Sequence, residues 1–160
     1  MSKLRAESAA LRRGLRGTLS AVVSCMSTFR PERGQIRVLC VDDDELILDC
    51  AERYLRDFEV VRFDKPHDAL VYVLEGRDVD VVVSDIMMPE MSGPELYLAC
   101  FQHSPSLARR FIFTSGDIAC AHRLLDAAMK TDVTLRMPQL LEKPFSKETL
   151  LAAVDLSRAA

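Results

Sequence analysis

The chain has 160 residues, of which 49% are apolar and 28% charged, so it can bury a core and is neither disordered nor fibrous. No apolar run approaches the roughly 18 residues that a membrane span needs. Residues 1–35 hold seven Lys and Arg against two Glu, whereas residues 36–160 hold fourteen basic and twenty-two acidic side chains. The acidic character of the larger part argues against nucleic-acid binding by this chain.

The first 35 residues differ in pattern as well as in charge, and we expect them to form an N-terminal extension. Apolar residues at 4-3-4-3 spacing predict a short helix: Leu15, Leu19, Val22, Met26 and Phe29. Two heptads are too few for a coiled coil, and the arginine- and serine-rich composition is also typical of a transit peptide. A helical extension, a flexible linker and a targeting peptide therefore all stay open, with residues 31–34 as the boundary.

From residue 36 onward, strand-like and helix-like segments alternate, which is typical of a parallel sheet covered on both faces. The expected strands are short apolar runs: 36–41, 59–63, 79–84, 110–113 and 140–142. The expected helices run over about 46–58, 66–76, 92–103 and 117–130, with a last one after Ser146. The prediction is an α/β fold of five βα units that form a doubly wound, five-stranded parallel sheet.

The helix predictions include caps and apolar stripes. Asp44 and Ser146 are placed to cap the first and the last helix. The second helix is expected to turn Ala69, Leu70, Val73 and Leu74 inward. The first helix has a longer apolar stripe: Leu46, Ile47, Cys50, Ala51, Tyr54, Leu55 and Phe58.

The five cysteines are widely spaced, and no two of them form a CxxC pair. This pattern predicts reduced thiols in a cytoplasmic protein and argues against a zinc site. The residues concerned are Cys25, Cys40, Cys50, Cys100 and Cys120.

Polar residues stand where the expected strands end. Asp42 and Asp43 follow the first strand, and Asp85 ends the third. Thr114 ends the fourth strand, and Lys143 follows the fifth. Because ligands of such sheets bind beyond the carboxyl ends of the strands, we expect these side chains to meet at one edge.

Three carboxylates at one edge repel one another unless a cation joins them, and Mg²⁺ is the ion that prefers such oxygen ligands. Lys143 would add a fixed positive charge and Thr114 a hydroxyl donor. Such a set suits a phosphoryl group, whose transfer depends on positioning and on stabilising the charge of its oxygens. A carboxylate in line with that group would accept it as an aspartyl phosphate.

Four segments in this order and spacing resemble the receiver domain of bacterial two-component response regulators: residues 38–44, 81–89, 111–116 and 141–145. The resemblance covers about residues 36–158. It implies a flavodoxin-like sheet with the strand order 2-1-3-4-5. It also implies that the chain is a regulatory phosphoacceptor, one that assists its own phosphotransfer and dephosphorylation without being an enzyme.

The resemblance assigns roles to the acidic residues. Asp85 would accept a phosphoryl group from a phosphohistidine of a histidine kinase or a histidine phosphotransfer protein. Mg²⁺, with Mn²⁺ as an alternative ion, would be held by Asp43, Asp85 and the backbone carbonyl of Met87, while Asp42 acts through water. The side chains of Met87, Met88 and Met91 are expected to pack in the loop.

The resemblance also implies that Thr114 and Lys143 contact the phosphoryl group and that the bond between Lys143 and Pro144 is cis. Thr114 and residue 140 would form the switch. Many receivers have Tyr or Phe at the second position, whereas this chain has Leu140. Receivers attached to hybrid histidine kinases often lack the aromatic too, and their Leu-Glu-Lys-Pro-Phe run is similar to residues 141–145. The usual aromatic readout is therefore expected to be absent or replaced.

Because the chain ends a few residues after its last helix, signalling is expected to go through contact with a downstream protein, through phosphate relay to another histidine, or through the N-terminal extension. Whether it forms a homodimer, or is part of a hybrid kinase, stays open. Two alternatives remain: a pseudo-receiver that binds without being phosphorylated, and a phosphatase of the haloacid-dehalogenase type. The phosphatase motif Asp-x-Asp-x-Thr lacks its Thr here, since residue 46 is Leu.

Overall fold

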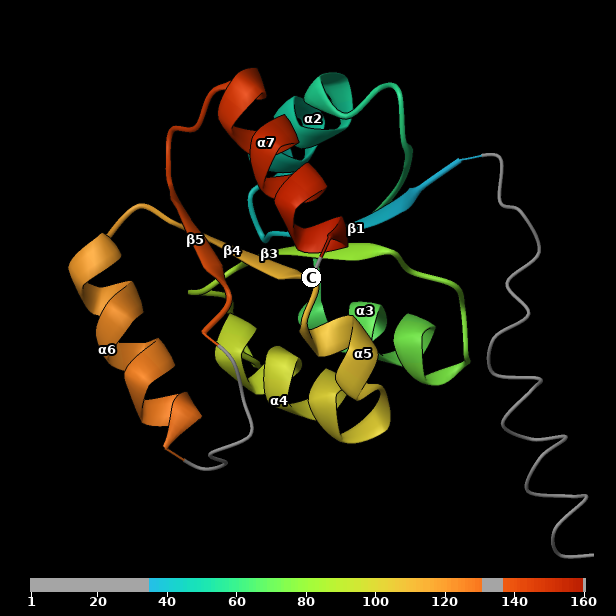
Figure 1. The fold of residues 1–160 in the computed structure, drawn as a ribbon. Helices are drawn as coiled ribbons and strands as arrows, with labels where there is room; N and C mark the ends of the chain where they lie inside the picture. Colours follow the sequence, from blue (N-terminus) through green and yellow to red (C-terminus); the bar gives the residue numbers. More distant parts are fainter. Residues whose placement is uncertain (1–34, 131–136, 160) are drawn as a thin grey trace, which may run out of the picture. The chain divides into compact units, whose positions relative to one another are not determined.

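The structure is a computed structural model that describes residues 35–130 and 137–159. The predicted N-terminal helix or linker, and Cys25 with it, lie outside the described residues. Figure 1 draws the described part in colour from blue to red along the chain.

Five parallel strands form one sheet in the order β2-β1-β3-β4-β5, which confirms the predicted doubly wound α/β fold. The strands are β1 Arg37–Val41, β2 Glu59–Phe63, β3 Val81–Asp85, β4 Phe111–Ser115 and β5 Gln139–Glu142. Both β3 and β4 are buried along their whole length, as strands covered on two faces must be. Each also extends by one or two residues beyond its predicted end, so that Asp85 and Thr114 belong to the ladder itself.

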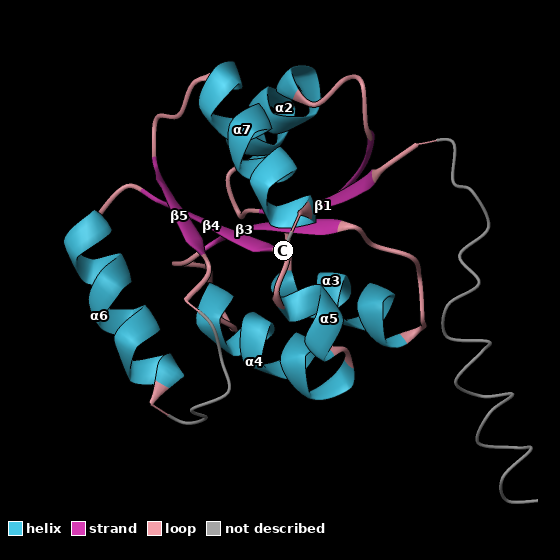
Figure 2. Cartoon of the chain, in the orientation of Figure 1, coloured by secondary structure: helices cyan, strands magenta, loops and turns pink. Residues whose placement is uncertain are grey.

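Helices cover both faces of the sheet, as Figure 2 shows. One face carries α2 and α7, which run over Glu45–Tyr54 and Lys147–Arg158. The other face carries α3 Pro66–Leu74, α4 Gly93–His103, the short α5 Pro105–Ala108 and α6 Ile118–Met129. The sequence did not predict α5, because four residues are too short to display a helical period.

Alternation along the strands divides the core in two, since successive side chains point to opposite faces. Val38, Cys40, Val81, Val83 and Ile112 pack with α2 and α7. Leu39, Val41, Val82, Phe111 and Phe113 pack with α3, α4 and α6. On this second side, Tyr97 of α4 meets the rings of Phe111 and Phe113 at centroid distances of 5.2 and 6.0 Å.

Two predicted helix faces need correction. Leu46 was expected in the apolar stripe but is 72% exposed, whereas Leu48 is buried with Ala51 and Leu55. The helix begins at Glu45 and ends at Tyr54, so Leu46 lies in its first turn and residues 48, 51 and 55 face the sheet. Leu74 is exposed as well, because it is the last residue of α3 and the chain then turns at Gly76 with φ +73°.

The predicted caps are confirmed. The Asp44 carboxylate accepts a hydrogen bond from the Leu46 N–H at 2.9 Å, and the Ser146 hydroxyl accepts one from the Thr149 N–H at 3.2 Å. These contacts fix where α2 and α7 begin, each directly after a strand end.

The four cysteines of the described part are free thiols, as predicted. Across residues 35–130 and 137–159, none of the helices combines the length and the apolar character that crossing a membrane requires.

Candidate functional site

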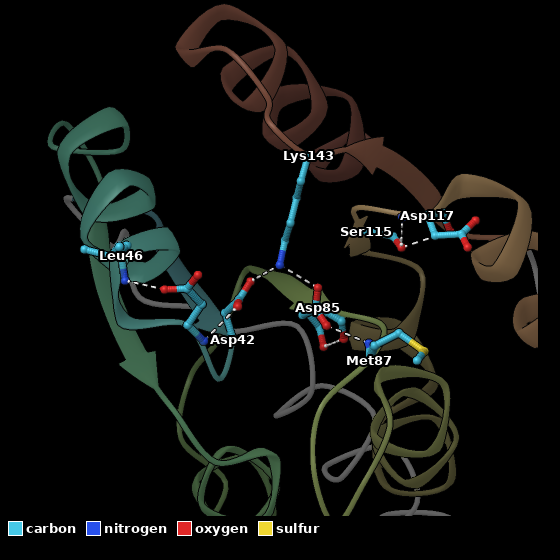
Figure 3. A network of polar contacts seen from close by, with 9 residues as sticks. Asp42, Leu46, Asp85, Met87, Ser115, Asp117 and Lys143 are labelled. Carbon is cyan, nitrogen blue, oxygen red and sulfur yellow. Dashed lines mark hydrogen bonds and ion pairs between the residues drawn. The ribbon is translucent and has the colours of Figure 1, made fainter.

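The carboxyl edge of the sheet brings together three of the predicted site residues. Asp42 follows β1, Asp85 ends β3 and Lys143 follows β5. The Lys143 Nζ donates hydrogen bonds of 2.6 Å to both Asp42 Oδ2 and Asp85 Oδ1, as Figure 3 shows. The two carboxylate oxygens are therefore no more than twice that distance apart.

Burial dominates the electrostatics of this group, which we call the Lys143 cluster (Lys143, Asp42 and Asp85). The side chains are 16%, 5% and 8% exposed, respectively. Burial raises the pKa of Asp42 above its ordinary value, and the hydrogen bond from Lys143 only partly offsets this effect. Burial alone would lower the pKa of Lys143, but its bonds to both carboxylates outweigh that and raise it.

The pKa values of Asp42 and Lys143 are both raised, which disfavours the charged form of Asp42 and favours the charged form of Lys143. The raised pKa of Lys143 means that its positive charge is stabilised, because one ammonium serves two carboxylates. The raised pKa of Asp42 means that its negative charge is disfavoured, because the cost of burial exceeds what the hydrogen bond and the charge of Lys143 return. With all three groups ionised, the cluster carries one excess negative charge inside the protein.

Backbone N–H groups hold the remaining carboxylate oxygens. The Asp44 N–H donates to Asp42 Oδ1 at 3.1 Å, and the Met87 N–H donates to Asp85 Oδ2 at 2.6 Å. Each oxygen of Asp42 and Asp85 thus has a partner. These contacts fix the orientation of both carboxylates, and the residue type at positions 44 and 87 gives no hint of them in the sequence.

Thr114 lies beside Asp85 in the parallel ladder of β3 and β4, where the two residues are paired in register. Its side chain is buried. Within the described part of the chain, its hydroxyl has no hydrogen-bond partner. The group is therefore available as a donor next to the Asp85 carboxylate.

Asp43 follows Asp42 at the same edge but takes no part in the hydrogen bonds of the Lys143 cluster. Its side chain is exposed and makes no hydrogen bond or ion pair with the residues that the structure describes. Over residues 35–130 and 137–159, no group of three or more His, Cys, Asp or Glu side chains is arranged to hold a metal ion.

The donor atoms at this edge nevertheless fit Mg²⁺. They are carboxylate oxygens and a nearby loop backbone, which are the hard ligands that this ion takes, usually together with several waters. The structure gives the lysine-bridged arrangement of these donors, with the exposed Asp43 unengaged beside it.

The loop after β3 corrects one prediction. Met88 is buried and Met91 is packed against the core, as expected. Met87, however, is 61% exposed, so its side chain does not pack in the loop. Figure 3 shows its N–H directed at Asp85 and its side chain pointing away.

The predicted switch position lies in β5. Leu140 pairs in register with Phe113 of β4 and is partly buried against the core on the α3 and α4 side. The bond between Lys143 and Pro144 is cis, as the resemblance implied.

Comparison with known proteins agrees with this fold. The model of the response regulator receiver domain family matches residues 38–155. The sensor kinase CckA of Brucella abortus is 35% identical over 125 residues, which are 76% of this chain but only 12% of that protein. The heme response regulator HssR of Staphylococcus saprophyticus is 42% identical over 60 residues, 36% of this chain and 26% of that protein.

Among solved structures, the chemotaxis protein CheY4 of Vibrio cholerae superimposes with a TM-score of 0.64 at 26% identity, covering 78% of this chain and 99% of that one. The chain thus spans a small part of the two relatives above and nearly all of the CheY4 structure. Since the family model covers most of residues 36–158, the chain belongs to the response regulator receiver domain family of two-component signalling.

Proposed function

We propose that Asp85 is the phosphoacceptor of this receiver and takes its phosphoryl group from a phosphohistidine. The donor would be a histidine kinase or a histidine phosphotransfer protein, and the result would pass to a downstream protein by contact. The observation that carries this proposal is the Asp85 carboxylate at the end of the buried β3, held by the Lys143 ammonium and the Met87 N–H.

The chemistry needs an oxygen nucleophile and compensation for charge. An Asp85 oxygen donates an electron pair to phosphorus, the P–N bond of the phosphohistidine breaks, and the imidazole nitrogen keeps that pair and takes up a proton. The transferred group carries its charge on three oxygens. Lys143, whose raised pKa keeps it protonated, supplies positive charge there, and the unengaged Thr114 hydroxyl supplies a hydrogen bond.

A divalent ion would complete the site. Asp43, Asp85 and the backbone carbonyl of Met87 would hold Mg²⁺, or Mn²⁺, with Asp42 acting through water. When bound, the ion neutralises the excess negative charge of the cluster and offsets the charge on the phosphoryl oxygens. The exposure of Asp43 leaves its carboxylate open to such a ligand.

The response to phosphorylation would begin at Thr114 and pass to β5. Thr114 and Leu140 lie on adjacent strands, because β4 and β5 pair with Phe113 opposite Leu140. Leu140 offers no ring to report the state of Asp85, so the readout would be a shift of aliphatic packing. In this proposal residues 36–158 act as the receiver, and residues 1–35 form a separate extension.

The test is phosphorylation of the full chain by acetyl phosphate in the presence of Mg²⁺, followed by intact-mass measurement. We expect the wild type to gain the mass of one phosphoryl group and Asp85→Asn to gain none. Asp80→Asn is the matched control, because Asp80 is also buried but precedes β3 at its other end. That variant should be phosphorylated normally.

Two results would point elsewhere. An unmodified wild type would favour the non-phosphorylated binding module. Steady turnover of a phosphomonoester would favour the phosphatase instead.

A further inference from the structure

The backbone carbonyl of Asp85 is contacted by two residues outside the Lys143 cluster, Ser84 and Gly93. The Ser84 hydroxyl donates a hydrogen bond to the Asp85 carbonyl oxygen at 2.9 Å. Ser84 is fully buried, so water does not compete for this bond. Gly93 approaches the same oxygen so closely that an added Cβ would lie 2.2 Å from it.

Gly93 can take this position only because it lacks a side chain. A Cβ would also meet the Phe113 ring at 3.0 Å and the Ile86 Cα at 3.1 Å. The Gly93 N–H donates to the Ile86 carbonyl at 3.0 Å, which closes the loop between β3 and α4. Because two of the three close contacts are with backbone, a larger residue would have to displace the chain at Asp85 and Ile86.

The start of α4 is itself held in place, so Gly93 is not free to move away. Ser92 and Glu95 form a capping box, in which the Glu95 carboxylate accepts from the Ser92 N–H at 2.7 Å. Pro94 follows in the first turn. Such a cap fixes the angle at which the chain enters a helix.

The position of the carbonyl matters because it sets the Asp85 side chain. Both carboxylate oxygens are bound, one to Lys143 and one to the Met87 N–H, so the side chain has little freedom of its own. A shift of the backbone at Asp85 therefore either moves the carboxylate or breaks one of these bonds. Displacement at phosphorus is sensitive to such a shift, since misplacement by about 1 Å can cost about a hundredfold in rate.

We propose that Ser84 and Gly93 are positioning residues for the phosphoacceptor: together they enclose the Asp85 carbonyl and so fix the place from which its carboxylate meets the phosphoryl group. The proposal rests on the proposed function, because it concerns the rate at which Asp85 is phosphorylated. Both residues are buried, so in this proposal they act through Asp85.

The first test is Ser84→Ala in the full chain, with Ser157→Ala as the matched control. Ser157 is equally buried and also loses one hydrogen bond, that from Gln139 Nε2 at 2.7 Å, but it lies in α7 away from Asp85. We expect Ser84→Ala to lower the maximal rate of phosphorylation by acetyl phosphate, at saturating Mg²⁺, about threefold to tenfold.

The donor concentration at half-maximal rate should stay unchanged, and Ser157→Ala should match the wild type in both quantities. A general loss of stability would not lower the maximal rate of Ser84→Ala alone, because well below the melting temperature both variants are folded. A Ser84→Ala rate within about twofold of the wild type, or an equal loss in Ser157→Ala, overturns the inference. An unmodified wild type would instead overturn the proposed function, and the inference with it.

The second test is Gly93→Ala, for which we expect a loss of maximal rate of about a hundredfold. Gly116→Ala is its control, because a Cβ at Gly116 meets nothing within 4 Å. If Gly93→Ala does not fold, the comparison of Ser84→Ala with Ser157→Ala still tests the positioning role. A folded Gly93→Ala that is phosphorylated at the wild-type rate would contradict the positioning role.

Discussion

In two parts of the molecule, several carboxylates contact one basic side chain, but the two groups differ in exposure to water. In the Lys143 cluster the groups are buried. In the second group, which we call the Arg62 cluster, Arg62 of β2 contacts three carboxylates of α2: Glu45, Asp49 and Glu52. There the guanidinium is 33% exposed and the carboxylates are 51–64% exposed.

The difference shows that exposure, and not contact distance, decides what an ion pair does. The distances are similar, 2.8 Å from Arg62 to Asp49 and to Glu52 against 2.6 Å in the Lys143 cluster. Water and salt screen the Arg62 cluster, so its pairs contribute little to stability. In the Lys143 cluster burial raises the pKa of Asp42, and two carboxylates share one ammonium at the place where phosphoryl chemistry is proposed.

The largest expected effect comes from Lys143→Met, which removes the only cation that contacts Asp42 and Asp85 within the described part of the chain. Two buried carboxylates then face each other, and we expect the free energy of unfolding at neutral pH to fall by about 3 kcal/mol. Urea unfolding without added Mg²⁺ measures this. Lys65→Met, at an exposed lysine, is the control; equal losses in both variants would refute the comparison.

A smaller effect of opposite sign is expected from Asp42→Asn. Burial raises the folded-state pKa of Asp42, so between its ordinary pKa of 3.8 and the raised value the folded protein binds more protons than the unfolded chain. Stability therefore falls as pH rises through that window, and the loss persists above it. The variant should be more stable than the wild type at neutral pH.

Unfolding measured across pH checks the direction of this change. The advantage of Asp42→Asn should shrink as the pH falls below 3.8, where Asp42 is protonated in both states of the wild type. A variant that is less stable at neutral pH would mean that Lys143 compensates Asp42 fully.

The smallest effect is expected from Arg62→Gln. The three carboxylates of α2 lose their shared partner, but they remain in water, so the melting temperature should fall only slightly at low salt. High salt should abolish even this difference, because exposed charges are screened. A loss as large as that of Lys143→Met, or one that salt does not reduce, would remove the distinction between the clusters.

The fold was largely predictable because its signals are local. Runs of β-branched residues and helical periodicity located the strands and most helices, and the rule for strand ends placed Asp85 and Lys143 at one edge. The side of α2 that faces the sheet was not predictable in detail. It depends on where the Asp44 cap starts the helix, and that choice exposes Leu46 and buries Leu48.

The site was predictable in its residue types but not in its arrangement. The sequence placed carboxylates and a lysine together and suggested a metal as the link, whereas in this structure Lys143 itself joins Asp42 and Asp85. The N–H groups of Asp44 and Met87 were beyond prediction, because every residue except proline has one.

At Met87 the backbone and the side chain have separate roles. Its contribution to Asp85 comes from the backbone, while its side chain stands 61% exposed beside the site. Any residue except proline can supply this N–H, so an exchange at position 87 changes the exposed surface beside the Lys143 cluster and keeps the hydrogen bond to Asp85. Ser84 and Gly93 allow no such freedom, since each acts through its own side chain or through the lack of one.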